Sequence, residues 1–394
     1  MDLYIHDYVG HLGQTEVARA LAERGHQVMF TYCHEMPTPR GGLTPDGLES
    51  LRIEPIHIGK PIIKDNYFKR QWTDILYGRA LVRHLSKHKP QLVVSANTPL
   101  APQWSLVRHC RRRGIPLIHW WTDIYSLAVR HGVGKKFGPL PWAYEKLEIH
   151  LLNQAQAVLG IAEQFRTIAQ GWKVRTPVSV IPVAAPLERV RPTTKSNAWS
   201  IKHGVDTTTN ILYCGTLANK HNPELLLALA DHFRDRPEVR VIVAAGGKSA
   251  DWLQRQQDAS RRPNLVLMPF QSLDDYPNVL ASADVQITIL KPEAAEYSLP
   301  SKVMSQLCSG RAQVAILPPD NQGAALVTAA DAGLVFKPGD FATAAAAIEK
   351  LMGDADARRR YGENGRRYAE EKLSLNVLAP QYEQLFERVA NEGR

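Results

Sequence analysis

Short apolar runs of strand length alternate with helical patterns along most of this chain, and the alternation stops once and then starts again. The first series opens with Met1–Ile5, followed by a helical pattern that ends at Gly25, and it continues to Val178–Ile181. The second series runs from Asn210–Cys214 to Gly333–Phe336. Such alternation is typical of βαβ units, and runs that are apolar throughout indicate parallel strands buried on both faces. The sequence therefore predicts two doubly wound α/β domains with parallel sheets.

A length of 394 residues agrees with two domains. The segment between the two series has no clear period, and we expect it to be a linker. The predicted organisation is a first domain over residues 1–188, a linker over 189–209, a second domain over 210–375 and a C-terminal helix over 376–394.

The four cysteines are scattered without metal-ligand spacing, which argues against a disulfide scaffold or a zinc module and favours a reducing compartment. The N-terminal residues lack the basic and apolar regions of a secretory signal. No run of about 18 apolar residues is present. We therefore expect a cytoplasmic protein that is soluble or peripherally bound at the inner face of the membrane.

The positive charge is concentrated in the first half of the chain. Residues 1–200 hold 26 Lys and Arg against 15 Asp and Glu, whereas residues 201–394 hold 22 against 24. This asymmetry favours an anionic partner, such as nucleic acid, a phospholipid surface or a phosphorylated substrate, over a plain solvated face. Aromatic residues interleaved with the basic runs favour lipid, and no nucleic-acid-binding motif is recognisable. The runs and their aromatic neighbours are Lys69-Arg70 with Trp72, Leu76 and Tyr77, and Arg111-Arg112-Arg113 with Trp104.

Two glycine turns come directly after predicted strands, where open α/β sheets bind ligands. The first contains Gly10 and His11, but it lacks the GxGxxG pattern of nicotinamide-binding proteins. The second contains Gly215 and Thr216, and Lys220 stands shortly before the next predicted helix. A lysine beside a helix N-terminus gives two sources of positive potential, which suits a diphosphate.

Two further strand ends carry polar residues. Pro300 is suited to begin a helix, so the amides of Ser301 and Lys302 are expected to face a ligand, and Glu296 offers a carboxylate to sugar hydroxyls. In the first half, Asp123 follows Trp121 at a strand end, and Asn97 occupies the corresponding position after the preceding strand. These residues could line an acceptor pocket; the alternative is a buried tryptophan pair with a helix-capping aspartate.

Taken together and in this order, the motifs resemble the two-domain nucleotide-sugar glycosyltransferases of the GT-B fold, specifically the large retaining family 4. Within that family they are similar to transferases of bacterial colanic-acid and O-antigen synthesis. The segments that carry the resemblance are Gly10-His11, "LA-x-RGH-x-V" at 21–28, Cys214–Leu217, "KHNP" at 220–223, "LPSK" at 299–302 and Cys308–Arg311.

The resemblance implies two Rossmann-like domains facing a central cleft. It also implies transfer of a hexosyl or N-acetylhexosaminyl group from a nucleoside-diphosphate sugar, most simply a UDP-sugar, to a hydroxyl of a glycan or lipid-linked acceptor. The reaction would retain the anomeric configuration and need no metal or cofactor. The catalytic residues would be Glu296, Lys220, Asp123 and His11. The donor-binding residues would be Gly10, Gly215, Thr216, Lys220, Phe270, Gln271, Glu296, Ser301, Lys302 and Ser305. The acceptor-binding residues would be Asn97, Trp121 and Asp123.

The chain departs from the family pattern at its glutamate pair. The second glutamate of the usual Glu-x7-Glu is replaced by Ser305, and the first would fall at Tyr297, next to Glu296. This departure favours one alternative, a non-catalytic subunit of GT-B fold that stabilises a partner transferase. A second alternative is a UDP-sugar epimerase, which shares the two-domain architecture and would need no acceptor.

Overall fold

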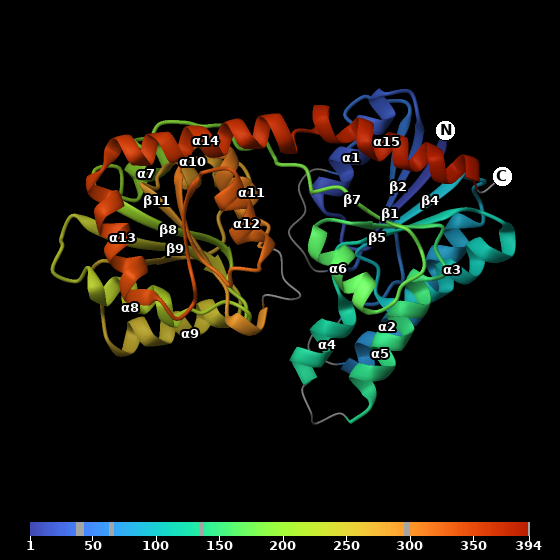
Figure 1. Ribbon diagram of the computed structural model, residues 1–394, viewed down its shortest axis with the longest axis horizontal. Coiled ribbons are helices and arrows are strands. Elements are labelled where there is room, and N and C mark those ends of the chain that lie inside the picture. Colours follow the sequence, from blue (N-terminus) through green and yellow to red (C-terminus); the bar gives the residue numbers. More distant parts are fainter. Residues whose placement is uncertain (37–42, 63–66, 134–137, 295–299, 393–394) are drawn as a thin grey trace. The chain divides into compact units, whose positions relative to one another are not determined.

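The computed structural model describes residues 1–36, 43–62, 67–133, 138–294 and 300–392, and the chain divides into two compact units (Figure 1). Unit 1 contains Met1–Ala184 together with Leu375–Arg394, and unit 2 contains Ala185–Ser374. Each unit is a parallel sheet with helices on both faces. The predicted α/β class with two doubly wound domains is confirmed.

The sheet of unit 1 has seven strands in the order β3-β2-β1-β4-β5-β6-β7, and all neighbouring pairs are parallel. The register places Leu3 beside both Val28 and Leu92, so β1 is central. The strands are β1 (Asp2–Asp7), β2 (Gln27–Cys33), β3 (Leu51–Ile56), β4 (Leu92–Ala96), β5 (Leu117–Trp121), β6 (Ala157–Gly160) and β7 (Val178–Val180).

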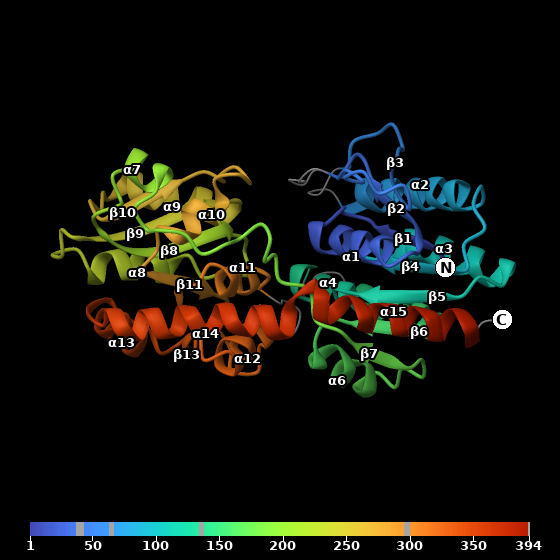
Figure 2. The same ribbon diagram turned by 90° about the horizontal axis from the view of Figure 1, so that it is seen from above.

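The helices of unit 1 cover the two faces of its sheet. Helices α1 and α15 pack together on one face, and α15 also contacts β4 and β5 (Figure 2). Helices α2, α3 and α5 pack on the other face around an apolar cluster that includes Tyr77 and Leu106. The helices are α1 (Leu12–Glu23), α2 (Tyr67–Leu85), α3 (Leu100–Arg113), α4 (Tyr125–Val133), α5 (Leu140–Leu152), α6 (Glu163–Gly171) and α15 (Leu375–Glu392).

The sheet of unit 2 repeats this order with six parallel strands, β10-β9-β8-β11-β12-β13. One buried cluster lies under α8, α9 and α13, and a second lies under α10, α11, α12 and α14. The strands are β8 (Thr209–Thr216), β9 (Val239–Gly246), β10 (Leu265–Met268), β11 (Val285–Ile289), β12 (Ala312–Ile316) and β13 (Gly333–Phe336). The helices are α7 (Ala198–Lys202), α8 (Glu224–His232), α9 (Lys248–Ala259), α10 (Tyr276–Ala281), the 3-10 turn Pro292–Ala294, α11 (Lys302–Cys308), α12 (Gln322–Ala329), α13 (Phe341–Gly353) and α14 (Ala355–Leu373).

The linker expected over 189–209 is wrong, because this segment is part of unit 2. It forms helix α7, whose N-cap Asn197 makes a capping box with Ser200. Val190 and Trp199 are buried in the apolar cluster of unit 2. The absence of a long hydrophobic period, which favoured a linker, instead reflects a helix of only five residues.

One strand of unit 1, β3, has no counterpart among the strands that the sequence predicts. It lies at the edge of the sheet and contains Pro55, which is tolerated at an edge because no second neighbour needs its amide. Arg52 and Glu54 interrupt its apolar pattern. An edge strand with one solvated side therefore lacks the continuous apolar run that marks the central strands.

Candidate functional site

The strand order reverses once in each sheet, between β1 and β4 in unit 1 and between β8 and β11 in unit 2. Loops leave the two strands of such a pair in opposite directions, so a crevice opens at their carboxyl ends and ligands bind there. Several residues predicted for binding follow these strands, among them His11 and Asn97 in unit 1 and Lys220 and Ser301 in unit 2. The two positions are described separately below.

In unit 2, Gly215 lies beside a lysine side chain at the end of β8. Its φ is +119°, a conformation that favours glycine, and a Cβ at this position would stand 3.8 Å from Cε of Lys302. Lys302 is the first residue of α11, which follows β11 in the chain. The strand pair at the switch point therefore brings Gly215 and Lys302 together, as the sequence predicts for a diphosphate site.

Lys302 is held by an aromatic side chain that bears no negative charge. Its Nζ donates a hydrogen bond to the hydroxyl of Tyr213 and lies 3.7 Å from the centroid of the same ring. The pKa of Lys302 is lowered to about 7, mainly by burial and in part by the positive charge of Lys220. A partly desolvated ammonium group beside a second cation is stabilised by a bound anion.

His221 follows Lys220 in the chain and packs edge-on beside Tyr213, with ring centroids 6.1 Å apart. It is buried, and its Nδ1 accepts a hydrogen bond from the amide of Ala218 at 2.9 Å. Burial lowers the pKa of His221 to about 3, and the charges of Lys302 and Lys220 both lower it as well. The imidazole is therefore neutral at physiological pH and is surrounded by positive potential.

The loops after β8 and β11 are joined by their backbones, since the amide of Lys291 donates to the carbonyl of Lys220 at 2.9 Å. Thr216 and Ser301 are exposed at this end of the sheet, as donor contacts require. Ser305 instead forms a side-chain hydrogen bond with the half-buried Tyr276. Glu296, the predicted catalytic carboxylate, lies outside the described residues.

Phe270 and Gln271 follow β10 and provide a surface for a flat ring. Phe270 is 50% exposed, and its ring packs on Gly246 so closely that a Cβ there would lie 2.3 Å from it. Gln271 accepts a hydrogen bond from the indole of Trp199 at 2.9 Å. The segment once expected to be a linker thus supports the predicted base-binding residues.

In unit 1, the buried Asp7 organises the loop after β1. Its Oδ2 accepts from the amide of His11 at 2.8 Å and lies 3.3 Å from Nδ1 of that ring. Its Oδ1 accepts from the amide of Val9 and from Nδ2 of Asn97 at 3.0 Å. Burial alone would raise the pKa of Asp7, but His11 and the hydrogen bonds lower it below its ordinary value. Asp7 is therefore an ionised carboxylate that holds His11.

Asn97 connects this carboxylate to the loop after β5. Its φ is +50°, its Nδ2 lies 3.1 Å from Nδ1 of His11, and its Oδ1 accepts from Thr122. The hydroxyl of Tyr125 donates to its backbone carbonyl at 2.8 Å. The predicted residues His11 and Asn97 are thus brought into one network at the β1/β4 switch point.

Asp123 and Trp121 are neighbours in sequence but differ in environment. Asp123 is exposed beside this network. Trp121 is only 1% exposed and packs edge-on against Phe165. The structure therefore agrees with the alternative of a buried tryptophan, and the side chain is not exposed for the predicted contact with an acceptor. Its indole donates to the buried Glu148 at 3.0 Å. Trp121 therefore belongs to the buried core that supports the loop after β5.

Comparison with known proteins decides the family. Residues 13–184 match the glycosyl transferase 4-like domain, and residues 208–354 match the glycosyl transferases group 1 domain. The chain belongs to the glycosyltransferases. The first match lies in unit 1 and includes Asn97, and the second lies in unit 2 and includes Gly215 and Lys302.

A curated relative of this glycosyltransferase is a protein of Escherichia coli (strain K12) assigned to colanic acid biosynthesis as the glycosyl transferase WcaI. The two are 27% identical over 182 residues, which is 45% of this chain and 44% of the relative. The match thus spans less than half the length of that protein.

Solved structures establish the GT-B fold. Sucrose-phosphate synthase from Thermosynechococcus elongatus superposes with a TM-score of 0.77 at 14% identity and covers 100% of both chains. HepE of Anabaena in complex with UDP-glucose gives 0.70 at 14% identity, covering 98% of this chain and 99% of its own. WaaG, a glycosyltransferase involved in lipopolysaccharide biosynthesis, gives 0.67 at 15% identity with the same coverage. The resemblance predicted from the motifs is confirmed.

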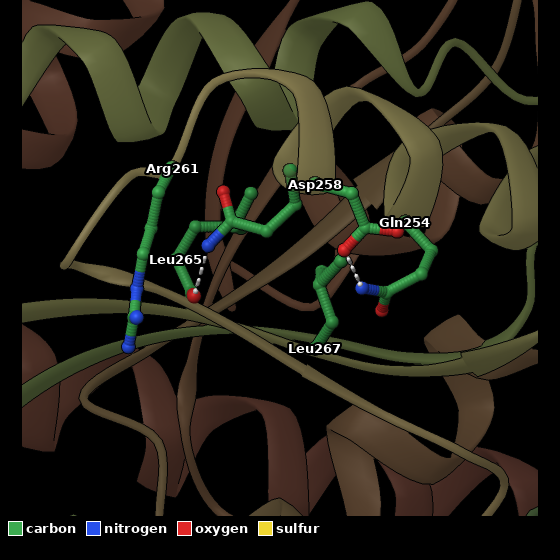
Figure 3. Close-up of a pocket in the computed structure, with 6 residues that line it drawn as sticks. Gln254, Asp258, Arg261, Leu265 and Leu267 are labelled. Atoms are coloured by element: carbon green, nitrogen blue, oxygen red, sulfur yellow. Dashed lines mark hydrogen bonds between the residues drawn. The ribbon is translucent and has the colours of Figure 1, made fainter.

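A pocket of this glycosyltransferase in unit 2 does not contain the predicted site. Gln254, Asp258 and Arg261 line it from α9 and the loop that follows, and Leu265 and Leu267 line it from the edge strand β10 (Figure 3). None of the predicted donor-binding residues that the structure describes borders it. Among the described residues, no helix combines the length and the apolar character that a membrane span requires.

Four residues of these networks were not identified from the sequence. Tyr213 lies within the apolar run of β8, and Asp7 is the last residue of β1, beyond the expected strand Met1–Ile5. His221 is recognisable only as a neighbour of Lys220. Glu148 lies on α5, 27 residues after the Trp121 that it contacts. Only the position of Asp7 at the end of the first strand could have indicated a role.

Proposed function

We propose that this glycosyltransferase moves a sugar from a nucleoside-diphosphate sugar to a hydroxyl of a glycan acceptor in surface polysaccharide synthesis. The observation that carries the proposal is the position of Lys302 at the β8/β11 switch point, where its side chain lies beside Gly215 and on the ring of Tyr213, next to the loop that contains Lys220. The colanic-acid assignment of the E. coli relative and the UDP-glucose complex of HepE support the substrate class.

The lysines would stabilise the leaving diphosphate. As the bond between the anomeric carbon and the phosphate oxygen breaks, negative charge grows on the diphosphate, and fixed cations lower the energy of this state. The acceptor oxygen forms the new bond on the same face of the sugar, and its proton passes to the leaving phosphate oxygen. The transfer would therefore retain configuration and need neither a metal ion nor a protein nucleophile.

The remaining predicted residues would position the substrates. The exposed ring of Phe270 would stack on the base, and Gln271 would contact its edge. Gly10, Thr216 and Ser301 would line the donor, with Glu296 orienting its sugar. His11, Asn97 and Asp123 would face the acceptor, which we propose to be a lipid-linked glycan.

Calorimetric titration with UDP, GDP, dTDP and ADP, first without metal and then with magnesium, tests the donor site. We expect one nucleotide, UDP, to bind without metal. If none binds, the chain is better explained as a non-catalytic partner subunit, the alternative that the serine at position 305 favours. If magnesium is required, the metal-independent mechanism is wrong.

A basic and aromatic surface of unit 1 would place the enzyme at an anionic membrane, on the cytoplasmic face where the donor is available. Trp104 is 43% exposed and stacks on His150, with ring centroids 5.3 Å apart. These rings line a cavity of about 470 Å³ together with Arg108 and Arg112. An aromatic ring among arginines suits the interface of anionic lipids.

Flotation with liposomes tests this surface. Reversing Arg108 and Arg112 to glutamate is expected to reduce partitioning onto phosphatidylserine vesicles by roughly thirtyfold or more, at about 1 kcal/mol for each basic residue removed. Neutral vesicles should bind the wild type weakly. The matched variant Arg234→Glu/Arg255→Glu changes two exposed arginines of unit 2 and should float like the wild type. Equal binding to neutral and anionic vesicles would contradict the proposal.

A further inference from the structure

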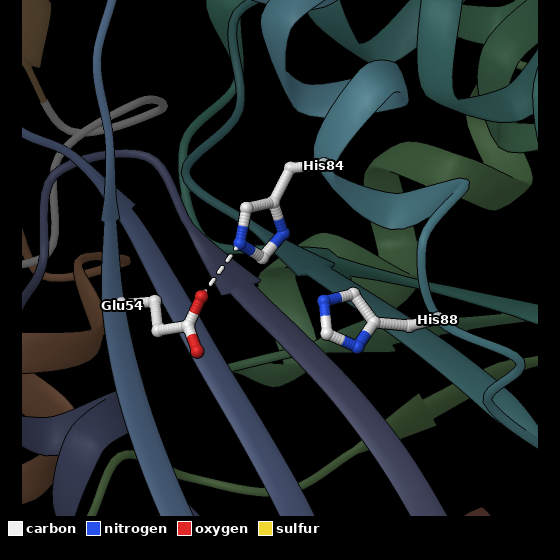
Figure 4. A group of neighbouring side chains, drawn as sticks. All are labelled: Glu54, His84 and His88. Atoms are coloured by element: carbon white, nitrogen blue, oxygen red, sulfur yellow. Dashed lines mark hydrogen bonds and ion pairs between the residues drawn. The ribbon is translucent and has the colours of Figure 1, made fainter.

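A group of two histidines and one glutamate lies between the edge strand and a helix of unit 1 (Figure 4). Glu54 is on β3, His84 is in the last turn of α2, and His88 follows four residues later. One ligand atom from each lies within 4.8 Å of the other two, and all three side chains are half-buried. This group is not used by the proposed transfer reaction.

Its donor set is one that zinc prefers. Two imidazole nitrogens and a carboxylate oxygen form a common three-residue set, with water completing a tetrahedron. Ligands about 2.1 Å from the metal are roughly 3.4 Å apart in such a tetrahedron. Nε2 of His84 and Oε2 of Glu54 are 2.9 Å apart, and no pair exceeds 4.8 Å, so small side-chain rotations would suffice.

The second ring nitrogen of His84 is already fixed. The hydroxyl of Tyr4, on the central strand β1, lies 2.9 Å from Nδ1 of His84, and Tyr4 is fully buried. Histidines that bind metals usually have their other nitrogen hydrogen-bonded in this way, which orients the ring toward the ion. Tyr4 therefore directs Nε2 of His84 toward Glu54, and the ring of His88 lies beside that of His84 with centroids 5.0 Å apart (Figure 4).

A second group, formed by His26, Glu383 and Glu387, is less suitable. The amino group of Met1 lies 3.3 Å from Nδ1 of His26, and the guanidinium of Arg24 lies 2.6 Å from a carboxylate oxygen of Glu383. A cation thus already neutralises this group.

We propose that Glu54, His84 and His88 bind a divalent ion of the zinc class that ties β3 to α2. Helix α2 connects β3 to β4 and runs back along the sheet, so its last turn lies toward the amino ends of the strands. The Asp7 network lies at the carboxyl ends. The ion therefore stabilises the edge of unit 1 and takes no part in sugar transfer.

Metal binding to the full, untagged chain tests the proposal after treatment with a chelator. We expect Zn²⁺ titration to show one ion bound by this group and to raise the unfolding temperature. Co²⁺ should give the visible absorption of a tetrahedral site. His84→Ala and His88→Ala should abolish all three signals. Tyr4→Phe, which leaves the ligands in place, should weaken Zn²⁺ binding by roughly 10- to 100-fold.

Two variants serve as controls. His109→Ala removes a half-buried histidine that belongs to neither group, and His26→Ala disrupts the second group. Both variants should bind Zn²⁺ and Co²⁺ as the wild type does. The proposal is overturned if the wild type binds no Zn²⁺, if binding survives in both His84→Ala and His88→Ala, or if His26→Ala abolishes it. Nucleotide binding in unit 2 is measured separately, so failure here leaves the donor-site test unaffected.

Discussion

Replacing Lys302 by methionine is expected to weaken UDP binding by roughly 10- to 100-fold, because hydrogen bonds to charged groups contribute about 1.5–3 kcal/mol. The rate of sugar transfer at saturating donor should fall by a further factor of about 100 or more, since charge on the leaving diphosphate loses a fixed donor. Calorimetry and a steady-state transfer assay measure the two effects. Lys220→Ala should lower binding and turnover together in the same way.

The pH dependence of UDP binding gives a sharper test of Lys302. Its pKa of about 7 in the free protein means that the ammonium form dominates below pH 7 and is lost above it. A bound diphosphate favours the charged form and raises this pKa, so the UDP dissociation constant should increase by up to about tenfold per pH unit above pH 7. Measurements from pH 7.5 to 9 avoid the phosphate titration near pH 6.

The methionine variant should bind weakly and show no such dependence on pH. Lys337→Met changes an exposed lysine that follows β13 at the same end of the sheet, and it should behave like the wild type. An unchanged rate in both Lys302→Met and Lys220→Ala would show that the diphosphate binds elsewhere.

The central strands and the family could be predicted from the sequence because both depend on local patterns. Parallel strands buried on both faces leave continuous apolar runs, as at β8 and β11. The glycine that ends such a run and the lysine that follows it stay close in sequence, so Gly215 and Lys220 could be identified. The solvated edge strand β3 and the short helix α7 leave no such pattern, and they were missed.

The candidate site was less predictable because its partners are distant in the chain. Tyr213 and Lys302 are 89 residues apart, and Asp7 and Asn97 are 90 apart. Strand order alone brings each pair together. Trp121 illustrates the opposite error: a tryptophan at a strand end can face either a ligand or the core, and only the position of Glu148 on α5 determines which.

Replacing Asp7 by asparagine is expected to lower the transfer rate by roughly 100-fold or more, as happens when a catalytic histidine loses its orienting carboxylate. Asp7 holds both the amide and the ring of His11, the residue proposed to face the substrates. Asparagine has nearly the same size but offers one acceptor oxygen in place of two, so the pair of contacts from His11 and Asn97 cannot both persist. The transfer rate and the affinity for UDP are measured in parallel.

A double-mutant cycle separates positioning from general damage. If Asp7 acts through His11, then Asp7→Asn should add little to the loss already caused by His11→Ala, and UDP binding in unit 2 should be unchanged. Fully additive losses, or no loss in Asp7→Asn, would contradict this role.

The pH dependence of unfolding supplies a second test of Asp7. Because the pKa of Asp7 is lowered in the folded chain, its ionisation stabilises the fold above about pH 4 and this contribution disappears as the pH falls further. The stability difference between the wild type and Asp7→Asn should therefore be larger at pH 7 than at pH 3.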